Sequence, residues 1–199
     1  MNNKATIRSP RILKETSRGT ECFCIEDDFF ERRELFLTTD VNVDSCNEIL
    51  KQLMYLNNKD SESEITLYIN SPGGAVDSGL AVYDCIRMMD APVRTVCTGT
   101  AASMGAIIFL AGDKRELFPH TQIMIHDPHY GSGIEGMKPL ELKERFDSLM
   151  KDRDVLCQII AERTGRSFNE VCEKTKFDSF FKANEAVEFG LATKIIKHL

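Results

Sequence analysis

The feature that most constrains the fold is the stretch over residues 93–112, where one apolar run passes through a turn of small residues into another. Residues 93–97 (VRTVC) are β-branched and apolar, which predicts a buried strand. Residues 104–111 are apolar and precede Gly112, which predicts a buried helix that ends at a glycine. Ser103 therefore lies at a strand-to-helix turn, among residues too small to cover its hydroxyl.

The turn at Ser103 has two interpretations. Backbone N–H groups at the start of a helix have no partner inside the helix, so they can stabilise negative charge on an attacked carbonyl oxygen. Alternatively, the small residues simply allow the helix to pack closely on the sheet. A short motif needs structural context to be decided, so both interpretations stay open on this stretch alone.

A second strand–loop–helix unit precedes this one. Residues 65–69 predict a strand, and a helix is expected over residues 78–89. The loop between them contains Gly73 and Gly74. These glycines permit either a tight turn that only glycine tolerates, or the close approach of a peptide to a main-chain N–H that could bind an oxyanion.

Further elements extend the alternation of strands and helices. Strands are expected over residues 34–38, 116–118, 122–126 and 192–196, and helices over residues 42–57, 138–163 and 183–189. This alternation predicts an α/β fold of one domain over residues 1–199, with parallel strands joined by right-handed crossovers. Active-site loops of such folds gather at the carboxyl ends of the strands, where Gly73 and Ser103 both lie.

Two segments are expected to lie outside this core. Residues 1–20 are polar, which predicts a flexible arm. The pattern over residues 138–163 is the longest helical pattern in the chain. A helix of this length on a core this small is expected to project and to pack against another subunit.

Composition excludes several classes of protein. A hydrophobic content of 42% over 199 residues allows one compact domain with a substantial core. A net charge of −6 argues against a general nucleic-acid surface, which would be basic. The sequence contains neither a run long enough to span a bilayer nor the apolar segment of a secretory signal, so we expect a cytoplasmic protein without a membrane partner.

The sequence also argues against a bound metal or nucleotide. Its seven cysteines are scattered without a C-x-x-C pair, and its four histidines do not complete a metal pattern, so we expect reduced thiols and no metal site. Three of the cysteines, Cys85, Cys97 and Cys157, are expected to be small core residues. Neither of the common glycine-rich phosphate-binding patterns is present, so the chain is not expected to hydrolyse ATP itself.

Acyl transfer to a serine needs a base, a group that orients the base, and an oxyanion hole. Ser103 is the candidate hydroxyl, although Ala101 stands where a nucleophile elbow has its first glycine. His126 ends a predicted strand on the same rim and is the best candidate base, with His120 and His129 as competitors. For the orienting carboxylate several candidates stay open: Asp178, Asp40, Asp77, Asp84, Asp113 and Asp127. Asp178 lies among phenylalanines, where a carboxylate is costly to desolvate unless it is paired.

Four segments, in this order and at these spacings, resemble the Clp protease family of serine peptidases: residues 68–74 (YINSPGG), 101–106 (AASMGA), 124–126 (MIH) and 185–191 (EAVEFGL). The resemblance runs from about Pro10 to the C-terminus. It implies a crotonase-like α/β fold of repeated β-α units with a protruding handle helix. It also implies a triad of Ser103 as nucleophile, His126 as base and Asp178 as orienting carboxylate, with the N–H groups of Gly74 and Met104 as the oxyanion hole.

The same resemblance implies an assembly. Two stacked heptameric rings would enclose a chamber, with the handle region near residues 130–163 interlocking the rings and residues 1–20 forming an axial gate. A hexameric AAA+ unfoldase would hydrolyse ATP and feed unfolded proteins into the chamber, so the chain itself needs no cofactor.

Two departures from the family pattern leave alternatives open. Lys176 and Phe177 precede Asp178 where the family usually has an Asp-Arg pair associated with ring–ring contacts, and Asp127 follows His126 and is expected to compete for its imidazole. These changes favour, as one alternative, a weakly active or regulatory subunit of a mixed ring. An alternative of another class is a crotonase-type acyl-CoA hydratase or isomerase, which uses a similar oxyanion hole without a serine nucleophile.

Overall fold

The computed structural model describes residues 10–17 and 19–198, and its centre is a seven-stranded sheet. Five strands form one continuous path, β3 (Glu34–Leu37), β4 (Ile65–Ser71), β5 (Val93–Ala102), β6 (Lys114–Leu117) and β9 (Lys194–Ile195). The remaining two, β7 (Gln122–Ile125) and β8 (Ser179–Lys182), branch off at β5. All neighbouring strands are parallel except β7 and β8, which pair antiparallel.

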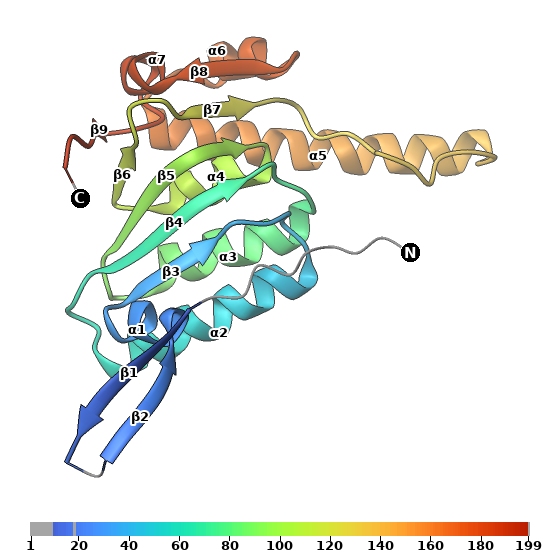
Figure 1. Cartoon of the computed structure of the whole chain (residues 1–199). Helices are drawn as coiled ribbons and strands as arrows, with labels where there is room; N and C mark the ends of the chain where they lie inside the picture. The colour runs from blue at the N-terminus through green and yellow to red at the C-terminus, as the bar shows by residue number, and fades with distance from the viewer. Residues whose placement is uncertain (1–9, 18, 199) are drawn as a thin grey trace, which may run out of the picture.

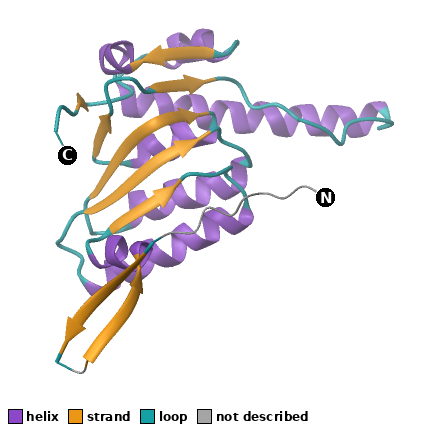
Figure 2. Ribbon diagram, viewed as in Figure 1, coloured by secondary structure: helices purple, strands orange, loops and turns teal. Residues whose placement is uncertain are grey.

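Helices cover one face of this sheet (Figures 1 and 2). Three of them lie side by side there, α2 (Val43–Lys59), α3 (Val76–Met88) and α4 (Met104–Ala111). Next to α4 runs α5 (Pro139–Thr164), and α6 (Phe168–Thr175) and α7 (Ala183–Phe189) follow it. The predicted α/β architecture with parallel strands is therefore confirmed.

The two halves of β5 have different neighbours, and this arrangement positions the functional site. Its first half pairs with β6 over Arg94–Cys97, and its last residues, Thr100–Ala102, pair with β7. Because β5 and β7 run parallel, the residues that follow their carboxyl ends emerge side by side. Those residues are Ser103 and His126.

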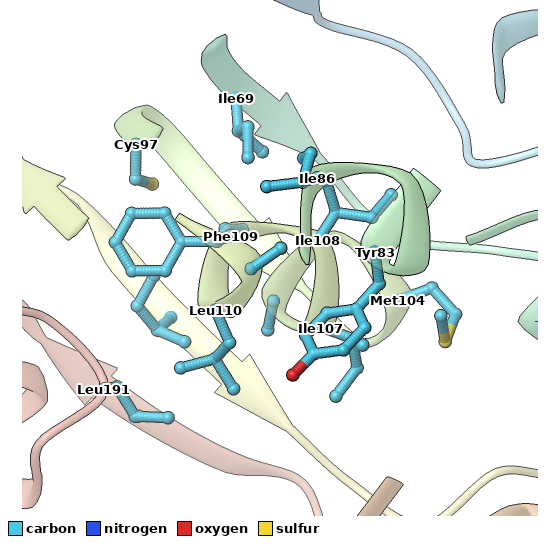
Figure 3. Packing of buried hydrophobic residues seen from close by; sticks show 14 of the residues in the cluster. Ile69, Tyr83, Ile86, Cys97, Met104, Ile107, Ile108, Phe109, Leu110 and Leu191 are labelled. Carbon is cyan, nitrogen blue, oxygen red and sulfur yellow. The ribbon is translucent and has the colours of Figure 1, made fainter. Parts of the chain in front are cut away.

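The core is built around α4, which the sequence predicts with the observed bounds. Every residue of α4 is buried, and the helix is apolar all round, as expected for a helix enclosed on several sides. Figure 3 shows its side chains spreading around the helix, with Phe109 and Leu110 among them. Both are fully buried near the C-terminal end of α4, and Met104 is buried at the end next to Ser103, so packing fixes both ends of the helix.

The N-terminal segment differs from its prediction. The sequence predicts a flexible arm over residues 1–20, whereas β1 (Arg11–Thr16) and β2 (Gly19–Cys24) form an antiparallel hairpin. Lys14 ties this hairpin to the short helix α1 (Ile25–Glu31) through Asp28, 2.8 Å away. Residues 1–9 of the expected arm lie outside the described residues, and its role as an axial gate stays a prediction.

The helix α5 projects beyond the sheet at its N-terminal half, as its length suggests (Figure 1). Apolar side chains lie exposed along this part, at Leu140, Leu142, Phe146 and Met150. No helix within residues 10–17 and 19–198 is both long and apolar enough to cross a membrane.

Candidate active site

Ser103 occupies a strained turn between β5 and α4. Its φ of 53° and ψ of −125° place it in a left-handed region that non-glycine residues rarely adopt. The main chain is held on both sides, because Ser103 N donates to Met124 O at 2.9 Å and Ser103 O accepts from Ala106 N at 2.9 Å. This conformation leaves the hydroxyl at the start of a helix, as in a nucleophile elbow, although the first glycine of that motif is absent.

The glycine loop after β4 packs against this turn. A Cβ on Gly73 would lie 2.6 Å from Ala102 O and 2.9 Å from Met104 N, and a Cβ on Gly74 would lie 2.1 Å from Val41 O. Both glycines also have positive φ, 95° and 149°. Side chains are therefore excluded here by contact and by backbone conformation together.

The N–H groups of Gly74 and Met104 are available to a ligand. In the described part of the chain, no hydrogen-bond acceptor is found for either of them. Met104 N belongs to the first turn of α4, where an N–H has no partner inside the helix. Two such donors on neighbouring loops are the arrangement that an oxyanion hole requires.

His126 follows β7 directly and faces the serine. Its Nε2 lies 2.9 Å from Ser103 Oγ, a hydrogen-bond distance between a candidate base and a candidate nucleophile. Burial lowers the pKa of His126 below its usual value, and the negative charge of Asp178 partly opposes this effect. A lowered pKa keeps the imidazole neutral, which is the form that can accept the serine proton.

Asp178 contacts the other side of this imidazole. It immediately precedes β8, and the antiparallel pairing of Ile125 with Ser179 brings Asp178 next to His126. Its Oδ1 lies 3.4 Å from His126 Nδ1, and its side chain is 62% exposed. The contact is therefore longer and more solvated than the one between His126 and Ser103.

The competing candidates lie elsewhere or have other partners. Asp77, Asp84, Asp113 and His120 do not line either cavity beside Ser103. The sequence predicts that Asp127 competes for the imidazole, whereas its carboxylate accepts a hydrogen bond from Arg153 Nε at 2.9 Å. His129 lies near the site, with its ring 5.2 Å from that of His126, and Asp40 lines the open groove.

Two cavities meet at Ser103. The smaller, of about 60 Å³, lies between α4, α5 and β7, and its apolar lining includes Val76, Met104, Ile107, Leu156 and Ile160. The larger is an open groove of about 710 Å³ that extends from the glycine loop past His126 to Asp178. A groove with a side pocket at a nucleophile suits an extended chain that inserts one side chain.

A model of one protein family, described as Clp protease, matches residues 17–199. The chain belongs to the Clp protease family. The resemblance that the sequence motifs indicate is thereby confirmed, and peptidase chemistry is the activity that this family implies. Clp proteases generally form oligomers and work with Clp ATPases.

The family match spans Ser103, His126 and Asp178, but their roles rest on geometry and stay a proposal. Among residues 10–17 and 19–198, no group of three or more His, Cys, Asp or Glu side chains is placed to hold a metal ion. Cys97 and Cys157 are buried as the sequence predicts, while Cys85 is only half-buried.

One residue beside the site escapes sequence reasoning. Arg153 lies in the middle of α5 and contacts the residue after His126. Within a long, mostly polar helical pattern an arginine indicates only a solvated face. Only the position of α5 beside the segment that follows β7 shows that the partner of Arg153 is Asp127.

Proposed function

We propose that this chain is the proteolytic subunit of an ATP-dependent Clp protease, a serine endopeptidase that hydrolyses unfolded proteins to short peptides. Ser103 is the nucleophile, His126 the general base and Asp178 the orienting carboxylate. The observation that carries the proposal is the 2.9 Å contact between His126 Nε2 and Ser103 Oγ, at a strained turn beside the N–H groups of Gly74 and Met104.

The mechanism follows from the positions of these groups. Ser103 Oγ attacks the peptide carbonyl while His126 Nε2 accepts its proton, and the N–H groups of Gly74 and Met104 receive the developing oxyanion. His126 then protonates the leaving amine, and water attacks the acyl-enzyme by the same route in reverse. Asp178 favours the tautomer with the proton on Nδ1, which leaves Nε2 free to accept.

The proposed assembly is two stacked heptameric rings around a chamber. Its support is the exposed apolar side of α5, since Leu140, Leu142 and Phe146 lie on a helix that projects from the core. A surface of this kind needs cover from another subunit. The ATP would be hydrolysed by a partner AAA+ unfoldase, and the proposed location is the cytoplasm.

A second candidate is a weakly active or regulatory subunit of a mixed ring. It is favoured by the exposure of Asp178 and by the two residues before it. Lys176 pairs with Glu173 at 2.6 Å, and the Phe177 side chain is 81% exposed, so neither supports the triad within this chain. The acyl-CoA alternative is less favoured, because it leaves the serine–histidine contact without a use.

A fluorophosphonate probe separates these candidates, because it phosphonylates only an activated serine, whose oxygen displaces fluoride from phosphorus. We expect the intact protein to be labelled, Ser103→Ala to lose the label, and the matched variant Ser61→Ala in a distant loop to keep it. Labelling that appears only after a partner ring is added would favour the mixed-ring subunit. Absence of labelling under both conditions would refute the proposed function.

A further inference from the structure

The residue after His126 is fastened to two helices at once. Asp127 N donates to the carbonyl oxygen of Thr175, the last residue of α6, at 2.7 Å. Asp127 Oδ2 accepts from Arg153 Nε in the middle of α5, at 2.9 Å. The two side chains are only 28% and 17% exposed, so the ion pair is shielded from solvent screening far more than a surface pair.

The contact from the other side of His126 is weaker. Asp178 is mostly exposed and 3.4 Å from the imidazole, so it restrains the ring only loosely. The position of His126 therefore depends strongly on the chain that carries it. Upstream, Met124 O accepts a hydrogen bond from Ser103 N, and downstream the nearest side-chain anchor is the bond from Asp127 to Arg153.

We propose that the Asp127–Arg153 ion pair is a positioning device for the general base. It fixes the chain directly after His126 to α5, and it holds the Asp127 carboxylate away from the imidazole. This inference rests on the proposed function, in which His126 takes the serine proton. Arg153 acts through Asp127 and touches no reacting atom, so it is a positioning residue.

Loss of Arg153 would leave the Asp127 carboxylate without its hydrogen-bond donor. Asp127 Oδ1 is already buried without a hydrogen-bond partner among the described residues. Without Arg153, Oδ2 would lose its bond as well, and an unpaired buried charge is strongly destabilising. The imidazole of the preceding His126 is an adjacent donor, so Asp127 would then compete with Asp178 for it.

Because Asp127 is negatively charged, this competition should change the pH dependence of activity through the pKa of His126. It already raises the pKa of His126 slightly, against the lowering by burial and by His129. The titratable and charged groups around the imidazole are Asp178, His129, Asp127, Arg153, Asp40 and Cys157. Freed from Arg153, the carboxylate of Asp127 would raise the pKa of His126 further.

The test compares Arg153→Met with Arg94→Met. The control removes a similarly shielded pair, Arg94 with Glu116 at 2.6 Å, from the opposite end of β5. Sedimentation first checks the size of each variant's assembly. The readouts are the rate at which a fluorophosphonate labels Ser103, and kcat and KM for a short fluorogenic peptide across pH.

We expect Arg153→Met to slow fluorophosphonate labelling and lower kcat on the order of 10-fold with little change in KM, since misplacement of a reacting group acts on the transition state. The acidic limb of kcat/KM should move to higher pH. Asp127→Asn should slow fluorophosphonate labelling but move the acidic limb to lower pH, because it removes the negative charge. Arg153→Lys should retain most of the activity, and Arg94→Met all of it.

The opposite shifts distinguish positioning from simple loss of structure. If Arg153→Met fails to assemble, Asp127→Asn alone still decides the matter, through the direction in which the limb moves. Wild-type labelling rates and pH profiles in both variants would overturn the inference while leaving the proposed function intact. Failure of wild-type protein to be labelled at Ser103 would refute the proposed function instead.

Discussion

Ser103 Oγ and His126 Nε2 lie 2.9 Å apart although the two residues are 23 positions apart in the chain. The contact arises because β5 extends past β6 and pairs with β7 near its own carboxyl end. The two residues thus follow adjacent parallel strands, and the main-chain hydrogen bond from Ser103 N to Met124 O fixes their relative positions along the strand direction. The geometry is a property of the sheet rather than of either residue.

The lowered pKa of His126 predicts the pH range of activity. Burial disfavours the imidazolium, so the base stays neutral at pH values where an ordinary histidine, with a pKa of 6.5, is half protonated. We expect the acidic limb of kcat/KM for a short peptide to fall below pH 6.5. A limb above that value in the assembled protein would contradict the burial of His126.

The same shift has a consequence for stability. Between the lowered folded pKa and the unfolded value of 6.5, the unfolded state binds more protons at this site, so stability should decline as pH falls through that range. Glutamine cannot titrate, so His126→Gln should weaken the dependence of the urea midpoint on pH in this range. An unchanged slope would show that other groups dominate.

Substitution of Gly73 tests the contact between the glycine loop and the serine turn. A methyl group at this position would lie 2.6 Å from Ala102 O, so Gly73→Ala should displace the turn and lower kcat on the order of 100-fold, by analogy with loss of an oxyanion donor. The control is Gly131→Ala, since a Cβ at Gly131 meets nothing within 4 Å and its φ is not positive. Equal activity of the two variants would contradict the packing described.

The small apolar pocket predicts a preference at the residue before the scissile bond. Ile160→Phe would fill part of its volume of about 60 Å³. We expect kcat/KM for a peptide with leucine at this position to fall on the order of 10-fold more than for one with alanine. Val155→Phe, on the exposed side of the same helix, should leave the ratio unchanged. An unchanged ratio in Ile160→Phe would show that substrates do not enter this pocket.

The helix α4 lies in the core, so substitutions of its large side chains are expected to lower the free energy of unfolding. Phe109 is fully buried, so Phe109→Ala should lower the free energy of unfolding by about 3–5 kcal/mol through lost burial and the cavity left behind. Phe177→Ala, at an exposed side chain, should change it by less than about 0.5 kcal/mol in the isolated subunit. Denaturation in urea at fixed protein concentration measures both.

Elements with a strong local pattern are predictable from the sequence here, whereas three strands that depend on their pairing are not. The helices over 104–111 and 183–189 have the observed bounds, because an apolar run or a capping sequence and a terminal glycine act locally. The hairpin formed by β1 and β2 is absent from the predictions, and so is β8. Strand pairing stabilises these segments: the residues of β1 and β2 are too polar to indicate a strand, and the two phenylalanines of β8 lie in a run of only four residues.

The sequence by itself determined the serine turn: two apolar runs, small residues between them and a glycine stop act within about 20 positions and need no distant partner. Its motifs also indicated the family. Only the tertiary structure decided which carboxylate faces His126. The pairing of β7 with β8 brings Asp178 to the imidazole, while α5 supplies Arg153 to hold Asp127 aside. Such contacts join segments distant in the chain, and their free energy depends on burial and distance, which exist only once the sheet and helices have packed.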